Sequence, residues 1–339
     1  MRVLNTLYVS DYQARIGVAK GSILVRKPDG STRVPIETLE ALVLQGGQIS
    51  VEALDLCVRN EVRVAALRRS GRLRFTVGPP TSGNVYLRVA QVRAADDRER
   101  AAEVARSIVI AKLASYRRSL LRWAADNEGP ERYVLKCEAE ALAERMQALD
   151  GVVDGDRLRG FEGDGTRRYF KGLAIALEPG GPVGRFEVRS RRPPRDPANS
   201  LLSFLYGLGL TEIVGALESV GLDPQVGFLH NLRPGRASLG LDLLEELRPI
   251  QDRMAVRLVR RRQVRLEHFV KTGAGGWYLS DEGKKVVLEL YEAERAVAVE
   301  HKLLDRSIDR WMLPTIQATL LARFLRGDLP SYPAYVMVS

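Results

Sequence analysis

Short apolar runs separated by turn residues fill the first part of the chain, at 3–9, 23–26, 33–36, 41–44, 62–67 and 73–77. Runs of this length between turn residues are typical of β-strands. Asp29-Gly30 stands between two of the runs and predicts a hairpin turn, as does Ser70-Gly71. One short helix is expected after Ser50, because serine caps helix N-termini well.

The hydrophobic pattern changes after a stretch rich in glycine and proline at 78–83. Apolar residues then recur at helical spacing, as Ile108, Leu113, Tyr116 and Leu120 do. This spacing predicts long helices over about 86–126, 131–148, 166–177, 197–221, 239–271 and 281–326.

Strands in one region and long helices in another predict an α+β protein with two segregated domains. We expect a β-rich, sandwich-like N-terminal domain at 1–78, followed by a linker at 79–85. A larger all-α domain is expected at 86–328, and the last residues, 329–339, have the composition of a loose tail. The candidate catalytic residues all fall in the helical part, which is therefore the expected catalytic domain.

The chain is strongly basic, with 52 Lys and Arg against 42 Asp and Glu among 339 residues and a formal charge of +10. Such an excess favours an anionic partner, most often nucleic acid. The two cysteines, Cys57 and Cys137, lack the spacing of a disulfide framework or a zinc site. Because no signal peptide and no apolar run of membrane length is visible, we expect a cytoplasmic protein.

Glu162 stands among small residues in Gly160-Phe161-Glu162-Gly163, just before a predicted helix. Small neighbours would let a phosphate backbone come close, and a carboxylate can hold a divalent metal that acts on a phosphoryl oxygen. The alternative is an ordinary glycine-rich loop whose acidic residue caps the next helix.

His230 follows the apolar pair Phe228-Leu229 and precedes the turn residues 233–235. An imidazole in such a loop can bind a metal or transfer a proton, although a purely structural histidine is the commoner case. The other two histidines, His268 and His301, fall in charged stretches and are expected at the surface or partly packed.

Glu245 and Glu246 follow Asp242 by three and four residues, so either of them can share one face of a predicted helix with Asp242. Helical periodicity does not choose between Glu245 and Glu246. The alternative is an amphipathic helix with a solvated acidic face. Pro249, directly after the acids, predicts a kink or an end of the helix.

Four arginines recur every fourth residue and form a basic stripe: Arg253, Arg257, Arg261 and Arg265. Such a stripe can follow a phosphate backbone, although a solvated helix face is the usual meaning of a charge run. A second basic cluster in the β-rich part includes Arg59 and Arg63. Because no aromatic residues are interspersed, contacts with a duplex backbone are favoured over stacking on a single strand.

Taken together and in this order, the motifs resemble a known family more closely than any one of them does alone. The strings that carry the likeness are Leu4-Asn5-Thr6-Leu7-Tyr8-Val9, Gly160-Phe161-Glu162-Gly163, Tyr169-Phe170, Arg192-Pro193-Pro194-Arg195-Asp196-Pro197-Ala198-Asn199-Ser200, Gly227-Phe228-Leu229-His230 and Asp242-Leu243-Leu244-Glu245-Glu246-Leu247-Arg248-Pro249. Together they resemble the CRISPR-associated integrase of spacer acquisition, CRISPR-associated protein one, over nearly the whole chain. These sequence strings are similar to those of type I systems, subtype C.

The resemblance implies an N-terminal β domain, a C-terminal helical domain and one bound divalent metal, Mn²⁺ or Mg²⁺. Its ligands, carried over by motif, are Glu162, His230 and Glu245. Asp242, one helical turn before Glu245, is a second acidic candidate. Tyr206 is expected to contact DNA or the active site, and Arg248 is expected to contact DNA.

The family's activity implies that the 3′-hydroxyl of a short foreign DNA fragment attacks a phosphodiester of the CRISPR repeat. The implied assembly is a homodimer, joined through the β-rich half and bridged by the small second CRISPR adaptation protein into a heterohexamer. A two-fold contact would also cover exposed strand edges. A separate nuclease that trims the fragments is a further implied partner.

Two other functions fit the same residues. One is a stand-alone metal-dependent nuclease that cuts branched DNA, which would yield cut strands and no joined strands. The other is a DNA-binding scaffold without chemistry of its own, which would need the arginines and no metal ligands. Loss of divalent metal binding on Glu162→Gln would decide for chemistry.

Overall fold

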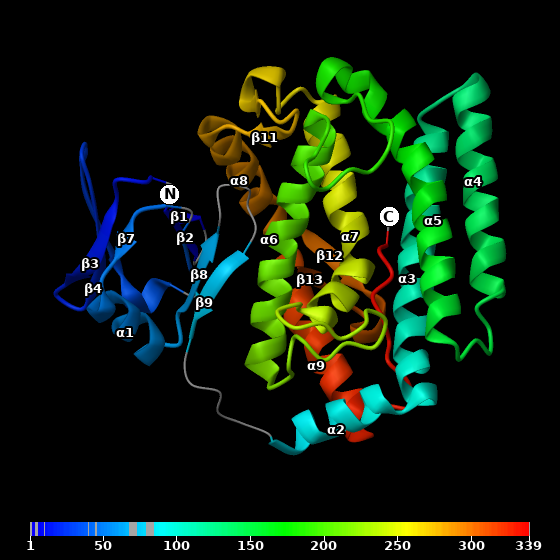
Figure 1. Ribbon diagram of the computed structural model, residues 1–339, viewed down its shortest axis with the longest axis horizontal. Helices are drawn as coiled ribbons and strands as arrows, with labels where there is room; N and C mark the ends of the chain where they lie inside the picture. The colour runs from blue at the N-terminus through cyan, green and yellow to red at the C-terminus, as the bar shows by residue number, and fades with distance from the viewer. Residues whose placement is uncertain are drawn as a thin grey trace. The chain divides into compact units, whose positions relative to one another are not determined.

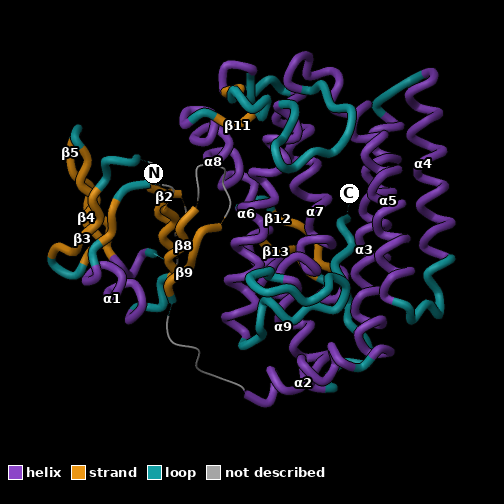
Figure 2. The backbone as a smooth tube through the Cα atoms, viewed as in Figure 1, coloured by secondary structure: helices purple, strands orange, loops and turns teal. Residues whose placement is uncertain are grey.

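The computed structural model describes residues 2–3, 6–9, 11–39, 41–44, 46–67, 73–78 and 85–338. The chain divides into two compact units. One, the β-rich unit, comprises Met1–Ser82 and Leu279–Glu294, and the other, the helical unit, comprises Gly83–Tyr278 and Arg295–Ser339. Nearly all of the predicted linker at 79–85 lies outside the described residues. The chain is thus mixed α+β, with strands mainly near its N-terminus (Figure 2).

The β-rich unit contains two sheets. The first has the order β1 (Arg2–Val3), β2 (Thr6–Val9), β6 (Ala41–Leu44), β8 (Arg63–Leu67) and β9 (Leu73–Val77). The second has the order β5 (Gly30–Pro35), β4 (Ser22–Lys27), β3 (Arg15–Ala19) and β7 (Gln48–Ile49). β2, β6 and β8 run parallel, so each neighbouring pair needs a crossover connection, and helix α1 (Val51–Arg59) lies in the crossover from β6 to β8.

The two sheets and α1 share one hydrophobic core. It joins Leu42 and Val64 of the first sheet to Ile23 and Val25 of the second, and all four are buried. The predicted turn at Asp29-Gly30 does join β4 to β5 as an antiparallel hairpin. Ser50 caps α1 as expected, since its side chain accepts a hydrogen bond from the Ala53 N–H. The predicted turn at Ser70-Gly71 lies outside the described residues.

One helix of the β-rich unit comes from late in the chain. Helix α8 (Asp281–Arg295) groups with the N-terminal strands, and the Tyr8 hydroxyl donates to the buried carboxylate of Glu292. This grouping differs from the predicted domain bounds, which placed the segment in one helical domain over 86–328. Sequence spacing does not report which core an amphipathic helix covers.

The expectation of one helix over 281–326 was also wrong. After α8 the chain forms an antiparallel hairpin of β12 (Ala298–His301) and β13 (Arg306–Asp309), and then helix α9 (Leu313–Arg326). Asp305 turns the hairpin with a φ of +46°, which interrupts helical geometry. A second short hairpin joins β10 (Phe269–Lys271) to β11 (Trp277–Leu279).

The helical unit is built from long helices that pack along one another (Figure 1). Its helices are α2 (Val85–Asp96), α3 (Arg98–Ala125), α4 (Gly129–Gln147), α5 (Gly155–Leu177), α6 (Pro197–Val220), α7 (Ser238–Arg260) and α9. Helix α3 packs against α4, α5 and α7, so it lies at the centre of the unit. Asp97, Asp154 and Asp196 cap α3, α5 and α6 through side-chain hydrogen bonds.

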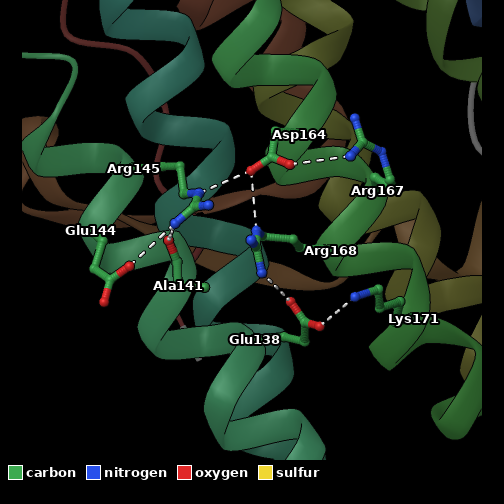
Figure 3. A network of polar contacts seen from close by, with 8 residues as sticks. All are labelled: Glu138, Ala141, Glu144, Arg145, Asp164, Arg167, Arg168 and Lys171. Carbon is green, nitrogen blue, oxygen red and sulfur yellow. Dashed lines mark hydrogen bonds and ion pairs between the residues drawn. The ribbon is translucent and has the colours of Figure 1, made fainter.

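Helix α5 begins eleven residues before the predicted start at 166, so Glu162 lies inside a helix and not in a loop. Gly165 serves packing, since a Cβ there would lie 2.2 Å from the Leu113 side chain of α3. The side of α5 that faces α4 is joined to it by ion pairs, including Arg145–Asp164 at 2.9 Å and Lys171–Glu138 at 2.9 Å (Figure 3). Close packing explains Gly165, whereas a Cβ at Gly160 or Gly163 would meet nothing within 4 Å.

Helix α6 is apolar on nearly every face. Its length and hydropathy would suffice to cross a membrane, but 67% of its most apolar window is buried within the protein. It packs against α7 and α9, so its composition is that of a central core helix.

Helix α7 continues through Pro249 and ends at Arg260, well before the predicted end at 271. Arg262 adopts a φ of +54°, which stops the helix and separates Arg265 from the other arginines of the predicted stripe. The stripe is therefore shorter than the sequence indicated.

The last described residues are not a loose tail. Tyr332, Tyr335 and Met337 are buried, and the chain runs beside α3 and α7 (Figure 1). The Met337 N–H donates to the Ser115 hydroxyl of α3 at 3.0 Å. Alternating buried tyrosine and methionine side chains anchor this segment, which its proline-containing composition did not reveal.

Candidate functional site

Asp242 organises the loop that carries His230. The Asp242 carboxylate is fully buried at the start of α7 and accepts backbone N–H bonds from Phe228, Leu229 and His230, at 2.6 to 3.0 Å. It also contacts His230 Nδ1 at 2.7 Å. Because a carboxylate with these partners acts as an acceptor, Nδ1 donates and Nε2 is left as the nitrogen that can bind a metal.

Two further features hold this loop against its neighbours. A Cβ at Gly227 would lie 2.8 Å from Asp242 Oδ2, so glycine allows the loop to approach α7 closely. Arg159 of α5 donates to the Leu229 carbonyl at 2.9 Å. The Gly-Phe-Leu-His string therefore has a physical reason: it lets the loop wrap a buried carboxylate and present an imidazole.

Glu245 lies one turn after Asp242, and only 3% of it is exposed. Its Oε1 atom is 4.0 Å from His230 Nε2 and 2.9 Å from the Arg248 guanidinium. Its Oε2 atom is 2.5 Å from the Lys112 ammonium. Burial raises the pKa of Glu245, but Arg248 and Lys112 together lower it to about 2, so the carboxylate is ionised at neutral pH.

Glu162 of α5 lies on the other side of the Lys112 ammonium. Its Oε1 atom contacts the Lys112 ammonium and accepts a hydrogen bond from the Thr166 hydroxyl at 2.8 Å. Its side chain is 22% exposed, which leaves this face of the site open to solvent. Glu162, His230 and Glu245 thus come from α5, a loop and α7; Lys112 links the two carboxylates, and His230 approaches Glu245.

This donor set fits a divalent cation in its chemistry. Two carboxylates and one imidazole nitrogen suit Mn²⁺ and also Mg²⁺. Among the described residues no three acidic, histidine or cysteine side chains are close enough to form a ready cluster. The Lys112 ammonium stands between the carboxylates of Glu162 and Glu245.

Glu246 lies on a different side of α7. Its buried carboxylate accepts hydrogen bonds from the Tyr332 hydroxyl at 2.6 Å and the Tyr335 N–H at 2.7 Å. Burial raises its pKa to about 7, against the lowering by these hydrogen bonds. Glu246 therefore anchors the C-terminal segment, and the choice that periodicity left open is resolved by packing. None of the three acids forms a solvated face.

Tyr206 and Arg248, which we expected to contact DNA, both lie in the interior. Tyr206 is 7% exposed and its hydroxyl donates to Asp252, while the Arg248 guanidinium stacks 4.7 Å from the tyrosine ring centre. Arg248 also pairs with Glu245, so its placement favours support of the acidic site over direct contact with DNA.

Three arginines of the predicted stripe line a cavity of about 750 Å³ in the helical unit. Arg253, Arg257 and Arg261 share this cavity with Arg260 of the same helix. Arg122 of α3 and Arg310 add further positive charge, and Asp126 and Glu300 offset part of it. Arg265 does not line the cavity and lies 3.8 Å from Glu267.

The remaining two candidates lie in the β-rich unit. Arg59, at the end of α1, pairs with Asp55 at 2.6 Å and is exposed. Arg63 begins β8 and is partly buried. Their expected contact with DNA stays a prediction.

Lys112 was not anticipated from the sequence, although a signal existed. It falls in the register of Ile108, Tyr116 and Leu120, all of them buried on the core side of α3. A lysine at such a position needs a buried anion. Thr166 and Asp252 were not anticipated either. Thr166 makes its contact one turn along α5, and Asp252 makes its contact across helices.

The chain is similar in sequence to known proteins over nearly its whole length. The profile of the family described as "CRISPR associated protein Cas1" matches residues 7–293. "CRISPR-associated endonuclease Cas1 2" of Rhodospirillum rubrum is 39% identical over 98% of this chain and 98% of its own. A "CRISPR-associated exonuclease Cas4/endonuclease Cas1 fusion" of Geobacter sulfurreducens is 33% identical over 88% of this chain and 54% of the fusion.

Solved structures share the fold. A casposase bound to its integration product superposes with a TM-score of 0.84 at 21% identity, over 98% of this chain and 94% of that one. A Cas6-RT-Cas1–Cas2 complex contains a chain that matches with a TM-score of 0.82 at 22% identity, over 98% of this chain and 36% of that one.

The relative in sequence is named an endonuclease, and the fold is shared with the casposase. The chain belongs to the Cas1 family of CRISPR-associated proteins.

Proposed function

We propose that this protein is a metal-dependent integrase of CRISPR adaptation. In this function, the 3′-hydroxyl of a short foreign DNA fragment attacks a phosphodiester of the CRISPR repeat, so that the DNA itself supplies the nucleophile. The observation that supports the proposal is the chain of contacts in which Lys112 links the carboxylates of Glu162 and Glu245, with His230 Nε2 4.0 Å from Glu245 Oε1. Membership of the Cas1 family and the likeness to a casposase support it.

The metal would be Mn²⁺ or Mg²⁺, held by the carboxylates of Glu162 and Glu245 and by His230 Nε2. When bound there, a divalent cation polarises a phosphoryl oxygen and stabilises the charge that develops on it. Asp242 does not serve as a ligand in this proposal, because backbone N–H groups and His230 Nδ1 engage both of its oxygens. It orients the imidazole instead.

The other residues of the site act on charge and position. Arg248 keeps Glu245 ionised and fixes one of its oxygens at 2.9 Å. The arginines of the α7 cavity would attract DNA phosphates, and their positive charge makes binding sensitive to salt. The protein carries no covalent intermediate in this scheme.

The expected partners follow from the relatives. One structural neighbour is part of a Cas6-RT-Cas1–Cas2 complex, which supports bridging of this chain by a small second adaptation protein into a heterohexamer. The fusion of an exonuclease with Cas1 in Geobacter sulfurreducens supports a separate trimming nuclease. A homodimer through the β-rich half, a cytoplasmic location and the type I, subtype C assignment stay predictions.

A stand-alone nuclease is the second candidate, since the relative from Rhodospirillum rubrum is named an endonuclease. It would use the same residues, with water in place of the DNA hydroxyl. Its products would contain cut strands without joined strands, so product analysis on supercoiled repeat DNA separates the two functions. A scaffold without chemistry would show neither product.

Glu162→Gln tests the proposed function. Strand transfer into supercoiled repeat DNA is expected to fall by at least about a hundredfold, because the site loses an anionic ligand. Glu144→Gln is the matched control, as Glu144 is exposed and belongs to the ion pairs between α4 and α5. Normal joining by Glu162→Gln at saturating Mn²⁺ would contradict the assignment.

A further inference from the structure

Lys112 is completely buried in α3, and its ammonium lies between two candidate metal ligands. It contacts Glu162 Oε1 on one side and lies 2.5 Å from Glu245 Oε2 on the other. The ring centre of Tyr116, one turn further along α3, is 5.2 Å from the ammonium. A positively charged group therefore stands where the two carboxylates converge.

Packing alone does not account for a lysine at this position. Burying an ammonium has a large desolvation cost, which ion pairs offset only when their geometry is good. Replacing buried ion pairs by apolar residues is often neutral or stabilising. An apolar residue would also match Ile108 and Leu120 in the same register of α3. The charge of Lys112 therefore calls for a role at the site.

The charges around this point balance without any metal. Glu162 and Glu245 are the two anions that face one another, and Lys112 and Arg248 are the two cations that contact them. Asp242 lies behind His230, where three backbone N–H groups share its charge. A divalent cation thus meets a pocket whose facing charges are already neutralised, and its electrostatic attraction is correspondingly reduced.

We propose that Lys112 is a positioning residue that acts as an internal counter-ion of the metal site. It holds the carboxylates of Glu162 and Glu245 in their facing arrangement when no divalent cation is bound, and it lowers the affinity of the pocket for that cation. The phosphates of bound DNA then restore the negative charge that retains the cation. This inference rests on the proposed function, because it takes Glu162, His230 and Glu245 as the ligands.

Lys112→Met and Lys112→Gln test the inference through metal binding, with Lys171→Met as control. Lys171 also pairs with a glutamate, Glu138, at 2.9 Å, but its side chain is exposed and belongs to the ion pairs between α4 and α5 (Figure 3). The full-length variants are titrated with Mn²⁺ and followed by electron paramagnetic resonance without DNA. We expect both Lys112 variants to bind Mn²⁺ about tenfold or more tightly than wild type and Lys171→Met, because a nearby positive charge is removed.

A second readout separates this role from a structural one. In metal-free buffer the Lys112 variants should melt at a lower temperature than wild type, and Mn²⁺ should raise their melting temperature by more. A lysine needed only for packing would weaken Mn²⁺ binding when replaced, so unchanged or weaker binding by folded Lys112→Gln overturns the inference. If Lys112→Met fails to fold, the glutamine variant still supplies the test.

The DNA requirement is measured with a short duplex in excess, and Glu162→Gln gives the background of Mn²⁺ bound to DNA alone. The duplex should tighten Mn²⁺ binding more in wild type than in Lys112→Met, whereas an equal gain overturns the counter-ion role. Failure of the proposed function looks different. In that case Glu162→Gln binds Mn²⁺ as wild type does.

Discussion

Asp252 shows how a buried acid can support a site without touching its ligands. It accepts a hydrogen bond from the Tyr206 hydroxyl, and its Oδ2 atom is buried without a partner among the described residues. Burial raises its pKa to about 6, although Tyr206 and Arg248 act in the lowering direction. The folded protein therefore favours the neutral carboxyl relative to the unfolded chain.

Asp252→Asn is expected to change the pH dependence of stability. Because the folded pKa lies above the usual 3.8, the stabilisation by the protonated carboxyl is complete below about pH 3.8 and is lost as the pH rises through about 6. Wild type should thus lose stability relative to Asp252→Asn between about pH 4 and pH 7. Thermal melts of both proteins across this range measure the difference, and a constant difference would contradict the expectation.

Helix α5 combines a functional residue with positions that demand glycine for packing. Gly172 approaches α3 and α4 so closely that a Cβ would lie 2.1 Å from the Leu120 side chain and 2.9 Å from Leu135. A Cβ at Gly160, by contrast, would meet nothing within 4 Å. The depth at which α5 packs against α3 sets how near Glu162 comes to Lys112.

Gly172→Ala is expected to destabilise the protein by about 1–3 kcal/mol, because both leucines are buried and have little room to move. Gly160→Ala in the same helix is the control, and it should raise stability by about 0.5–1 kcal/mol through reduced flexibility of the unfolded chain. Chemical denaturation of the two variants measures both values. Equal effects from the two substitutions would show that close packing does not constrain Gly172.

The helical unit gathers positive charge from segments far apart in the chain. The cavity beside α7 takes arginines from α3, α7 and the residues after β13, and the C-terminal segment contributes Tyr335 and Met337 to its wall. Glu246 anchors that segment, so one acid of α7 helps to shape a basic cavity while its neighbour Glu245 faces the candidate metal site.

The salt dependence of DNA binding tests whether the arginines of the cavity contact DNA phosphates. The double variant Arg257→Gln with Arg261→Gln should weaken binding to any duplex and reduce the slope of log affinity against log salt by about 1 per lost phosphate contact. Arg323→Gln, an exposed change on α9 outside the cavity, should leave the slope unaltered. A slope that does not differ from wild type would place the DNA path elsewhere.

Much of the architecture could be predicted from local pattern. The strand-rich start, the Ser50 cap and the Asp29-Gly30 hairpin depend on neighbours in sequence, and they were found. The ends of helices were harder to predict, because Asp305 and Arg262 adopt left-handed backbone angles that their residue types do not indicate. The grouping of α8 with the β-rich unit depends on which core its apolar face meets.

Residue order alone sufficed to identify the family, since its motifs stay recognisable without coordinates, and the same motifs name Glu162, His230 and Glu245 as candidate ligands. Packing in three dimensions was needed to separate Glu245 from Glu246, to show Asp242 holding the imidazole and to bring Lys112 between two carboxylates. The physical reason is that these contacts join different helices. Their energies depend on distance and burial across the core, which spacing along one helix does not encode.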